Sequence, residues 1–404
     1  MRGSPMIPKR AFAVLFAAVL AAGGCGLSDE PPAASPGGGG GTGTIKVGGV
    51  SSLSGAVTFP DSSAAAKAVF DRVNEQGGIN GQKIEYVSAD DKGDPAAAAQ
   101  AARDVVTNQG VVALVGSASL LDCAVNAPFY QQSAIVSIQG TGVDPTCFES
   151  PAISPVNTGP YLNMAINLYY ASEVLKRDKV CMFLAILGNT NDAYGGAVTS
   201  WTKLTGKKLT LDDRTVKPDS DPTPFVLRAR KEGCQAVLYN GTEPMAISWM
   251  KVVKQQNITG IDWLMTTAPY TDAVAKALGA DGDGMYANAE FEPFTEAESP
   301  ALADWRELMT AKNVPLTSFG QGGYLAATYF VDALKSIKGP ITRQSVAAAF
   351  KALKPIQTQM TGTPYEFGEA AKHLSNRAGK IVRLKGGKWQ VVTSEWVKYP
   401  GTLG

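Results

Sequence analysis

The sequence contains little material for acid–base or metal chemistry. Only one of its 404 residues is a histidine, His373, and none of its five cysteines belongs to a Cys-x-x-Cys pair. Histidine is the commonest proton carrier in active sites and a frequent metal ligand, so its scarcity argues against most hydrolytic and metal-dependent enzymes. We therefore expect a protein that is not an enzyme, with no catalytic residue, no metal and no cofactor.

An excess of charge of one sign is also lacking. Lys and Arg together number 37 and Asp and Glu 36, which gives a formal net charge of +1 at pH 7. A protein that binds the nucleic-acid backbone needs a concentration of positive charge, so nucleic acid is not an expected partner. With 45% hydrophobic residues, a chain of this length can bury one or two cores, and two domains are expected.

The apolar run at the amino terminus is too short to span a bilayer. It covers residues 11–22, about a dozen positions against the roughly 20 that a transmembrane helix needs. Basic residues precede the run and two glycines separate it from Cys25, an order that resembles a bacterial lipoprotein signal, although Ala22 stands where leucine is more usual. We predict a signal peptide over residues 1–25 and lipidation of Cys25, the alternative being plain secretion with an incidental cysteine.

Residues 26–44 are rich in Gly, Pro and Ser and include the run Gly37–Gly41. This composition is typical of a flexible tether. A phosphate-binding loop would have to follow a strand, and none precedes this run. Anchor and tether together predict a body held at the outer face of the cell membrane.

Four cysteines remain after Cys25, namely Cys123, Cys147, Cys181 and Cys234. An even number in an oxidising compartment indicates disulfides rather than a metal site. Of the three possible connectivities we favour Cys123 with Cys147 and Cys181 with Cys234. The second pair stands at the start of two apolar segments, which adjacent parallel strands would bring together.

Strand-like and helix-like segments alternate along the rest of the chain. The first series has apolar strands at 45–50, 83–89, 111–115 and 134–138. A second series restarts near Thr158, with strands at 180–187, 236–239, 263–265 and 285–287. Such alternation predicts parallel sheets covered by helices on both faces. Ligands bind beyond the carboxyl ends of such strands, so two facing sheets would form a site lined from both sides.

Four motifs at turns and strand ends carry a family resemblance, namely Val47–Gly55, Gln76–Gly81, Ala89–Pro95 and Val115–Ser119. In this order and spacing they resemble the branched-chain amino acid group of periplasmic substrate-binding proteins, which have the type I fold. The likeness runs from about Thr44 to the final hairpin near Trp389.

The resemblance implies an α/β protein of two doubly wound lobes, joined by three hinge strands around a ligand cleft. Lobe 1 would comprise residues 45–157 and about 291–355, and lobe 2 residues 158–290 and about 356–404. Members close this hinge over a small molecule and deliver it to the permease of an ABC importer. We expect such a protein, as a monomer.

By the same resemblance, the pocket consists of strand-end loops from both lobes. Ordinary turn chemistry and packing explain the same residue types equally well. The candidate ligand-binding residues are Phe59, Ser119, Leu120, Gln139, Gly140, Thr141, Tyr194, Glu243 and Thr267.

One departure concerns the ligand. Amino-acid binders of this group place an acidic residue after the strand at 263–265, and this sequence has Thr266, Thr267 and Ala268 there. A buried ammonium without a counter-charge is costly, unless Glu243 or Asp192 replaces it. An amino acid, an amide and a small or aromatic carboxylate all stay open as ligands.

Two other classes of function stay open. An extracytoplasmic sensor would use the same fold and pocket. A lipoprotein hydrolase would need a nucleophile, but Gly-x-Ser-x-Gly does not occur, and residues 115–119 are the nearest approach.

Overall fold

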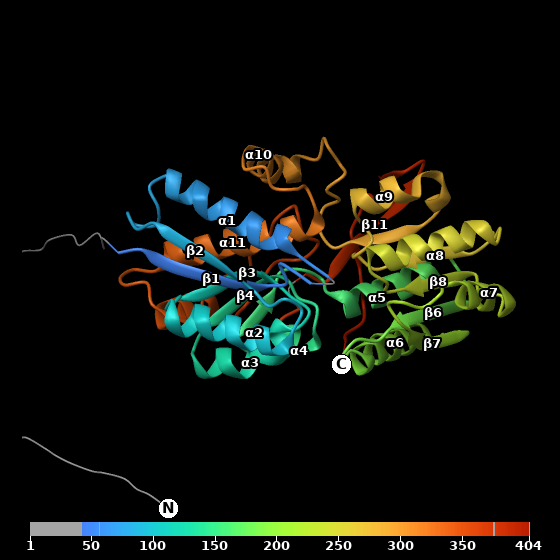
Figure 1. Cartoon of the computed structure of the whole chain (residues 1–404), viewed down its shortest axis with the longest axis horizontal. Helices are drawn as coiled ribbons and strands as arrows, with labels where there is room; N and C mark the ends of the chain where they lie inside the picture. Colours follow the sequence, from blue (N-terminus) through green and yellow to red (C-terminus); the bar gives the residue numbers. More distant parts are fainter. Residues whose placement is uncertain (1–42, 56, 375, 404) are drawn as a thin grey trace, which may run out of the picture. The chain divides into compact units, whose positions relative to one another are not determined.

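The computed structural model describes residues 43–55, 57–374 and 376–403. All of them belong to one compact unit, Gly40–Gly404. The predicted signal peptide, Cys25 and the tether up to residue 42 lie outside the described residues. The described chain is a mixed α/β structure with two lobes built on parallel sheets, which confirms the predicted fold class (Figure 1).

The sheet of the first lobe has the strand order β2-β1-β3-β4-β5, and all its strand pairs are parallel. Alternate residues of β3 point to opposite faces: Ala113 and Val115 join one hydrophobic cluster and Leu114 another. Its strands are β1 (Ile45–Ser51), β2 (Ile84–Asp90), β3 (Ala113–Ala118), β4 (Val136–Thr141) and β5 (Ile153–Pro155).

Helices cover both faces of this sheet. The first pair, α1 (Pro60–Glu75) and α11 (Ser318–Ser336), packs on one face, and α2 (Pro95–Arg103) and α3 (Asp122–Gln132) pack on the other. A π-helical turn, η1 (Asp104–Asn108), extends α2. Further helices of this part are α4 (Pro145–Glu149), η4 (Pro300–Leu302), α10 (Ala303–Ala311) and α12 (Arg343–Lys351).

Glycines allow α11 to lie directly on α1 and β4. A Cβ atom on Gly323 would lie 1.9 Å from the backbone oxygen of Ser62, and one on Gly140 would lie 2.2 Å from the hydroxyl of Ser62. Gly140 of the candidate pocket is therefore required for packing beneath the strand end.

The sheet of the second lobe has the order β12-β11-β10-β9-β8-β6-β7, with β13 paired to β11. The five strands from β10 to β7 are parallel, whereas β11 and β12 are antiparallel additions. Its strands are β6 (Val180–Ala185), β7 (Leu211–Val216), β8 (Ala236–Tyr239), β9 (Asp262–Met265), β10 (Tyr286–Ala289), β11 (Ala378–Lys385), β12 (Lys388–Val391) and β13 (Val397–Lys398).

The last strands of this sheet form the final hairpin near Trp389 that the sequence indicated. Gly386 and Gly387 both have positive φ, the conformation that a tight hairpin turn requires, and they return the chain antiparallel.

Helices also cover both faces of the second sheet. Residues of α5 and α6 pack on one face, and residues of α7, α8 and α9 pack on the other. These helices are α5 (Pro160–Tyr169) with the π-helical turn η2 (Tyr170–Val174), α6 (Asn191–Thr205), α7 (Thr223–Lys231), α8 (Glu243–Gln255), α9 (Asp272–Leu278) and the 3₁₀ turn η3 (Gly279–Gly282).

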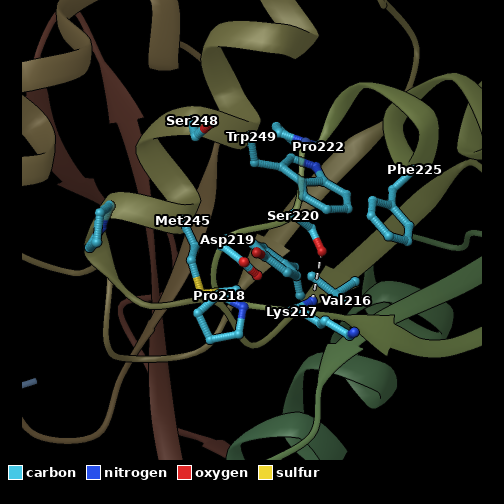
Figure 2. Close-up of a pocket in the computed structure, with 12 residues that line it drawn as sticks. Val216, Lys217, Pro218, Asp219, Ser220, Pro222, Phe225, Met245, Ser248 and Trp249 are labelled. Atoms are coloured by element: carbon cyan, nitrogen blue, oxygen red, sulfur yellow. Dashed lines mark hydrogen bonds between the residues drawn. The ribbon is translucent and has the colours of Figure 1, made fainter. Parts of the chain in front are cut away.

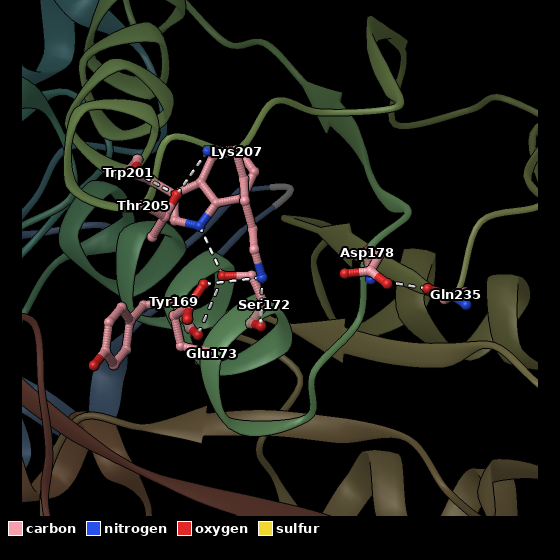
Figure 3. A network of polar contacts seen from close by, with 8 residues as sticks. All are labelled: Tyr169, Ser172, Glu173, Asp178, Trp201, Thr205, Lys207 and Gln235. Carbon is pink, nitrogen blue, oxygen red and sulfur yellow. Dashed lines mark hydrogen bonds and ion pairs between the residues drawn. The ribbon is translucent and has the colours of Figure 1, made fainter.

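Polar contacts connect η2, which precedes β6 in the chain, to the end of α6 (Figure 3). Lys207 forms an ion pair of 3.0 Å with Glu173, and the indole of Trp201 donates to the hydroxyl of Ser172 over 3.0 Å. This end of the second lobe lies opposite the carboxyl ends of its strands, so the network stabilises the lobe away from the candidate site.

Both predicted disulfides are present. Cys123 is bonded to Cys147 in the first lobe, and Cys181 to Cys234 in the second. Strands β6 and β8 are parallel neighbours, as the pairing required. Among the described residues, no helix combines the length and the apolar character needed to cross a membrane.

Candidate functional site

The chain passes between the two sheets three times, after β5, after β10 and before β11. The carboxyl ends of the parallel strands carry the loops that the sequence singles out. The structure shows which of these side chains are engaged in internal contacts.

Ser119, after β3, fastens its own loop. Its hydroxyl accepts hydrogen bonds from the backbone N–H groups of Leu121 and Asp122, both at 2.9 Å, and donates to the buried carboxylate of Asp91. The Ser119 side chain thus fixes the start of α3, while the neighbouring Leu120 is half-buried.

Gln139 meets the same network from β4. Its amide donates to Asp122 over 3.1 Å and to Ser137 over 2.9 Å. Burial raises the pKa of Asp122 to about 6. Hydrogen bonds donated by Tyr130 and other groups act in the opposite direction and lower it, but by less. The structure therefore brings Ser119 and Gln139 together around Asp122, beneath the loop rather than on its surface.

Tyr194, in the first turn of α6, lies near the loop that follows β4. Its ring packs edge to face on Tyr161, with centroids 5.0 Å apart. The Tyr161 hydroxyl donates to the backbone oxygen of Val143 over 3.0 Å, two residues beyond Thr141. Burial raises the pKa of Tyr194 to about 12, so its hydroxyl is neutral and can donate. Tyr194 of the second lobe is thus linked through Tyr161 to Val143, in the loop that follows Thr141.

A second region of the site includes the start of α1, in the first lobe, and the start of α8, in the second. Phe59 packs edge to face on Phe319 at 5.0 Å, and Asp61 accepts from the Thr317 hydroxyl over 2.8 Å. Burial raises the pKa of Glu243, a hydrogen bond with Thr271 opposes this shift, and the charge of Asp61 adds to it. These two carboxyl groups come from different lobes and lie near enough to repel. The sequence did not indicate Asp61, which stands only two residues after Phe59.

Thr267 lies beside a buried carboxyl of the hinge. Its hydroxyl accepts from the side-chain amide of Asn163 over 2.6 Å, and that amide lies 3.4 Å from Glu290. Glu290 also accepts from the backbone N–H of Gly159 over 2.8 Å. Burial raises the pKa of Glu290 to about 7.

The sequence did not indicate Asn163 or Glu290. One signal was available for the first: Asn163 and Asn167 stand four positions apart on a helix that is otherwise mostly apolar. Asn167 donates to the backbone oxygen of Met265 over 2.9 Å, which fixes the strand before Thr267.

The three crossovers are hydrogen-bonded to one another. Thr158 donates to the backbone oxygen of Ala378 over 2.8 Å, and Asn376 donates to that of Glu290. Lys380 and Glu292 form an ion pair of 2.8 Å with both side chains largely buried. The hinge is thus a connected polar unit.

The remaining polar candidates lie elsewhere. Asp192 is exposed at the start of α6 and accepts from Asn191 over 3.0 Å. His373 is buried and stacked on Phe367, and its Nδ1 lies 2.7 Å from the backbone oxygen of Ile153. The described residues contain no group of three or more potential metal ligands.

A family model described as periplasmic binding protein matches residues 44–388. The chain belongs to the periplasmic binding protein family. This membership accords with the two lobes, the three crossovers and the loops at the strand ends, and it implies a location outside the cytoplasm.

Named relatives and solved structures agree with this family. A Leu/Ile/Val-binding protein of Rhizobium johnstonii is 24% identical over 355 residues, which cover 84% of this chain and 93% of that protein. A possible leucine/isoleucine/valine-binding protein from Rhodopirellula baltica superposes with a TM-score of 0.76 at 19% identity, covering 87% of this chain and 96% of that one.

A solute-binding protein from Rhodopseudomonas palustris, solved with p-hydroxybenzoic acid, superposes with a TM-score of 0.74 at 17% identity, covering 88% of this chain and 97% of that one. Similar folds thus occur in proteins whose names give different ligands, and the fold alone does not select one.

Proposed function

We propose that this protein is the extracytoplasmic solute-binding component of an ABC importer, held to the membrane by lipid on Cys25, and that it captures one small polar molecule by hinge closure. The observation that carries the proposal is that side chains of the two lobes approach each other at the carboxyl ends of both sheets. Parallel sheets of this kind bind ligands at that edge.

The ligand would lie between the loops after β3 and β4 and the starts of α6 and α8. We assign its contacts to Leu120 and Thr141 from the first lobe and to Tyr194 and Glu243 from the second. Ser119 and Gln139 would support the loop through Asp122, Phe59 would form an apolar wall, and Thr267 would connect the ligand site to the hinge.

The polar groups of this site favour a neutral or anionic head group. Thr141 and Tyr194 offer hydroxyl donors, which can bind a carboxylate or an amide oxygen. Burial raises the pKa of Glu243, because it disfavours the charged carboxylate that an ammonium would need as its partner. The proposed ligand classes are amides and small or aromatic carboxylates, with amino acids as the alternative in which Glu243 binds the ammonium.

The test is a thermal-shift screen of the chain lacking residues 1–42 against amino acids, amides, aromatic acids and short carboxylates. A ligand that binds only the native state raises the melting temperature. Tyr194→Ala should abolish the rise in melting temperature. Tyr194→Phe should retain the ring contact with Tyr161 and lose only part of that rise. The absence of a shift with every class would contradict the proposal.

A further inference from the structure

The second lobe contains a cavity that none of the proposed ligand contacts lines. Its volume is about 220 Å³, and it lies at the carboxyl ends of β7 and β8, next to the starts of α7 and α8 (Figure 2). All of its lining residues fall between Val216 and Trp249, so the first lobe contributes nothing to it. The cavity is therefore complete within one lobe.

Stacked aromatic rings form one side of this cavity. Tyr239 stacks on Trp249 with ring centroids 4.3 Å apart, and Phe225 stacks on Trp249 at 6.0 Å. Trp249 and Tyr239 are buried, whereas Phe225 and Met245 are half-buried and so retain accessible surface. Ring faces and a methionine side chain provide favourable contacts for another aromatic ring.

Polar groups stand around these rings. Lys217 is exposed at the rim, and its backbone N–H donates to the hydroxyl of Ser220 over 2.9 Å. The indole N–H of Trp249 is buried and has no acceptor among the described residues. Buried donors are nearly always partnered, so a bound molecule with an acceptor oxygen would satisfy a group that the protein leaves unpaired.

The volume limits the size of the occupant. An apolar cavity of about 150 Å³ is enough to bind benzene, so one of about 220 Å³ admits a single ring with a small polar substituent. A fused or long-chain molecule would exceed it. An anionic substituent would suit the ammonium of Lys217.

We propose that this cavity is a second small-molecule site, which binds a single-ring aromatic acid with its ring against Phe225 and Trp249 and its carboxylate towards Lys217. This site is distinct from the cleft between the lobes and does not depend on the function proposed above.

The test uses benzoate by calorimetric titration and 4-fluorobenzoate by ¹⁹F NMR, on the chain from residue 43. Met245→Trp should fill the cavity and weaken binding at least tenfold. Leu204→Trp adds the same side chain at an exposed position of α6 in the same lobe and should leave binding unchanged.

A second variant tests the charge at the rim of the site. Lys217→Ala should weaken benzoate several-fold and leave the binding of uncharged benzamide unchanged. Tyr194→Ala, which alters the cleft, should remove any benzoate bound between the lobes and leave one benzoate bound per protein at this cavity. Loss of benzoate binding in Tyr194→Ala with retention in Met245→Trp would place benzoate in the cleft and overturn the proposal, as would no measurable binding to the unmodified chain.

Discussion

At the scale of single residues, Glu290 makes the hinge sensitive to pH. Its pKa is about 7 in the folded protein, against an ordinary value of 4.5. Between these values the folded state binds the proton more tightly than the unfolded state does. The stability that this group contributes is therefore greatest below 4.5 and is lost as the pH rises through 7.

Glu290→Gln removes this titration and keeps an acceptor for the N–H of Gly159. Relative to the unmodified protein, the variant should gain about 3 kcal/mol in free energy of unfolding between pH 4 and pH 8. Urea unfolding of both proteins at pH 4, 6 and 8 measures the gain. A difference that stays constant with pH would show that Glu290 does not titrate in this range.

A second residue-scale prediction restores the missing counter-charge. Thr266 and Thr267 are buried, whereas Ala268 is half-buried and keeps some accessible surface. In Ala268→Glu, a new carboxylate could pair with an ammonium, and charge-assisted hydrogen bonds of this kind contribute about 1.5–3 kcal/mol.

Calorimetry should then show that Ala268→Glu binds leucine roughly ten- to a hundredfold more tightly than the unmodified protein does. Ala268→Gln has the same size without the charge and should show no such gain. Equal affinities in all three proteins would mean that this position does not face the ligand's amino group.

At the scale of elements, the fit of α11 on α1 depends on a glycine. The Cβ of Gly323→Ala would meet the backbone of Ser62, which cannot rotate away, and overpacking of this kind costs about 1–3 kcal/mol. Gly196→Ala in α6 is the matched control, because no atom lies within 4 Å of the position that its Cβ would take. Thermal unfolding should show a lower melting temperature for Gly323→Ala only.

The two disulfides differ in the length of chain that they close. Cys181 and Cys234 are 53 positions apart, and Cys123 and Cys147 are 24 apart. By the chain-entropy model, replacing the first pair with serines should cost about 4 kcal/mol, and replacing the second slightly less. Guanidinium unfolding of the two double variants tests the order, and a larger loss for the shorter loop would contradict it.

At the scale of the whole molecule, binding of a ligand between the lobes should make the protein more compact. X-ray scattering with a saturating ligand from the thermal screen should show a smaller radius of gyration than the free protein. Tyr194→Ala at the same ligand concentration should retain the larger radius. An unchanged radius in the ligand-bound protein would exclude hinge closure.

The alternation of strands and helices was predictable from the sequence, because buried parallel strands form continuous apolar runs. Strand β7 was missed, since its sequence Leu-Asp-Asp-Arg-Thr-Val is largely polar and it lies at the sheet edge. Strand β5 was also missed, because it has only three residues and ends in proline.

The loops of the candidate site were also predictable, as Ser, Gly and Thr mark strand ends. The partners of Glu290 and Asp61 were not predictable from the sequence. Gly159 and Thr317 come from distant segments of the chain, which only the packing of the crossovers and helices brings to these carboxyl groups.

The position of α11 has a consequence for the order in which the protein can fold. This helix covers β3 and β4, yet it begins 177 positions after β4 ends. At a synthesis rate of about 5–20 residues per second, the part of this face that lies beneath α11 waits roughly 9 to 35 seconds for its helix. The whole parallel part of the second sheet is made in that interval. The parallel part of the second sheet can therefore form before α11 completes the first lobe, although β11, β12 and β13 join it only afterwards.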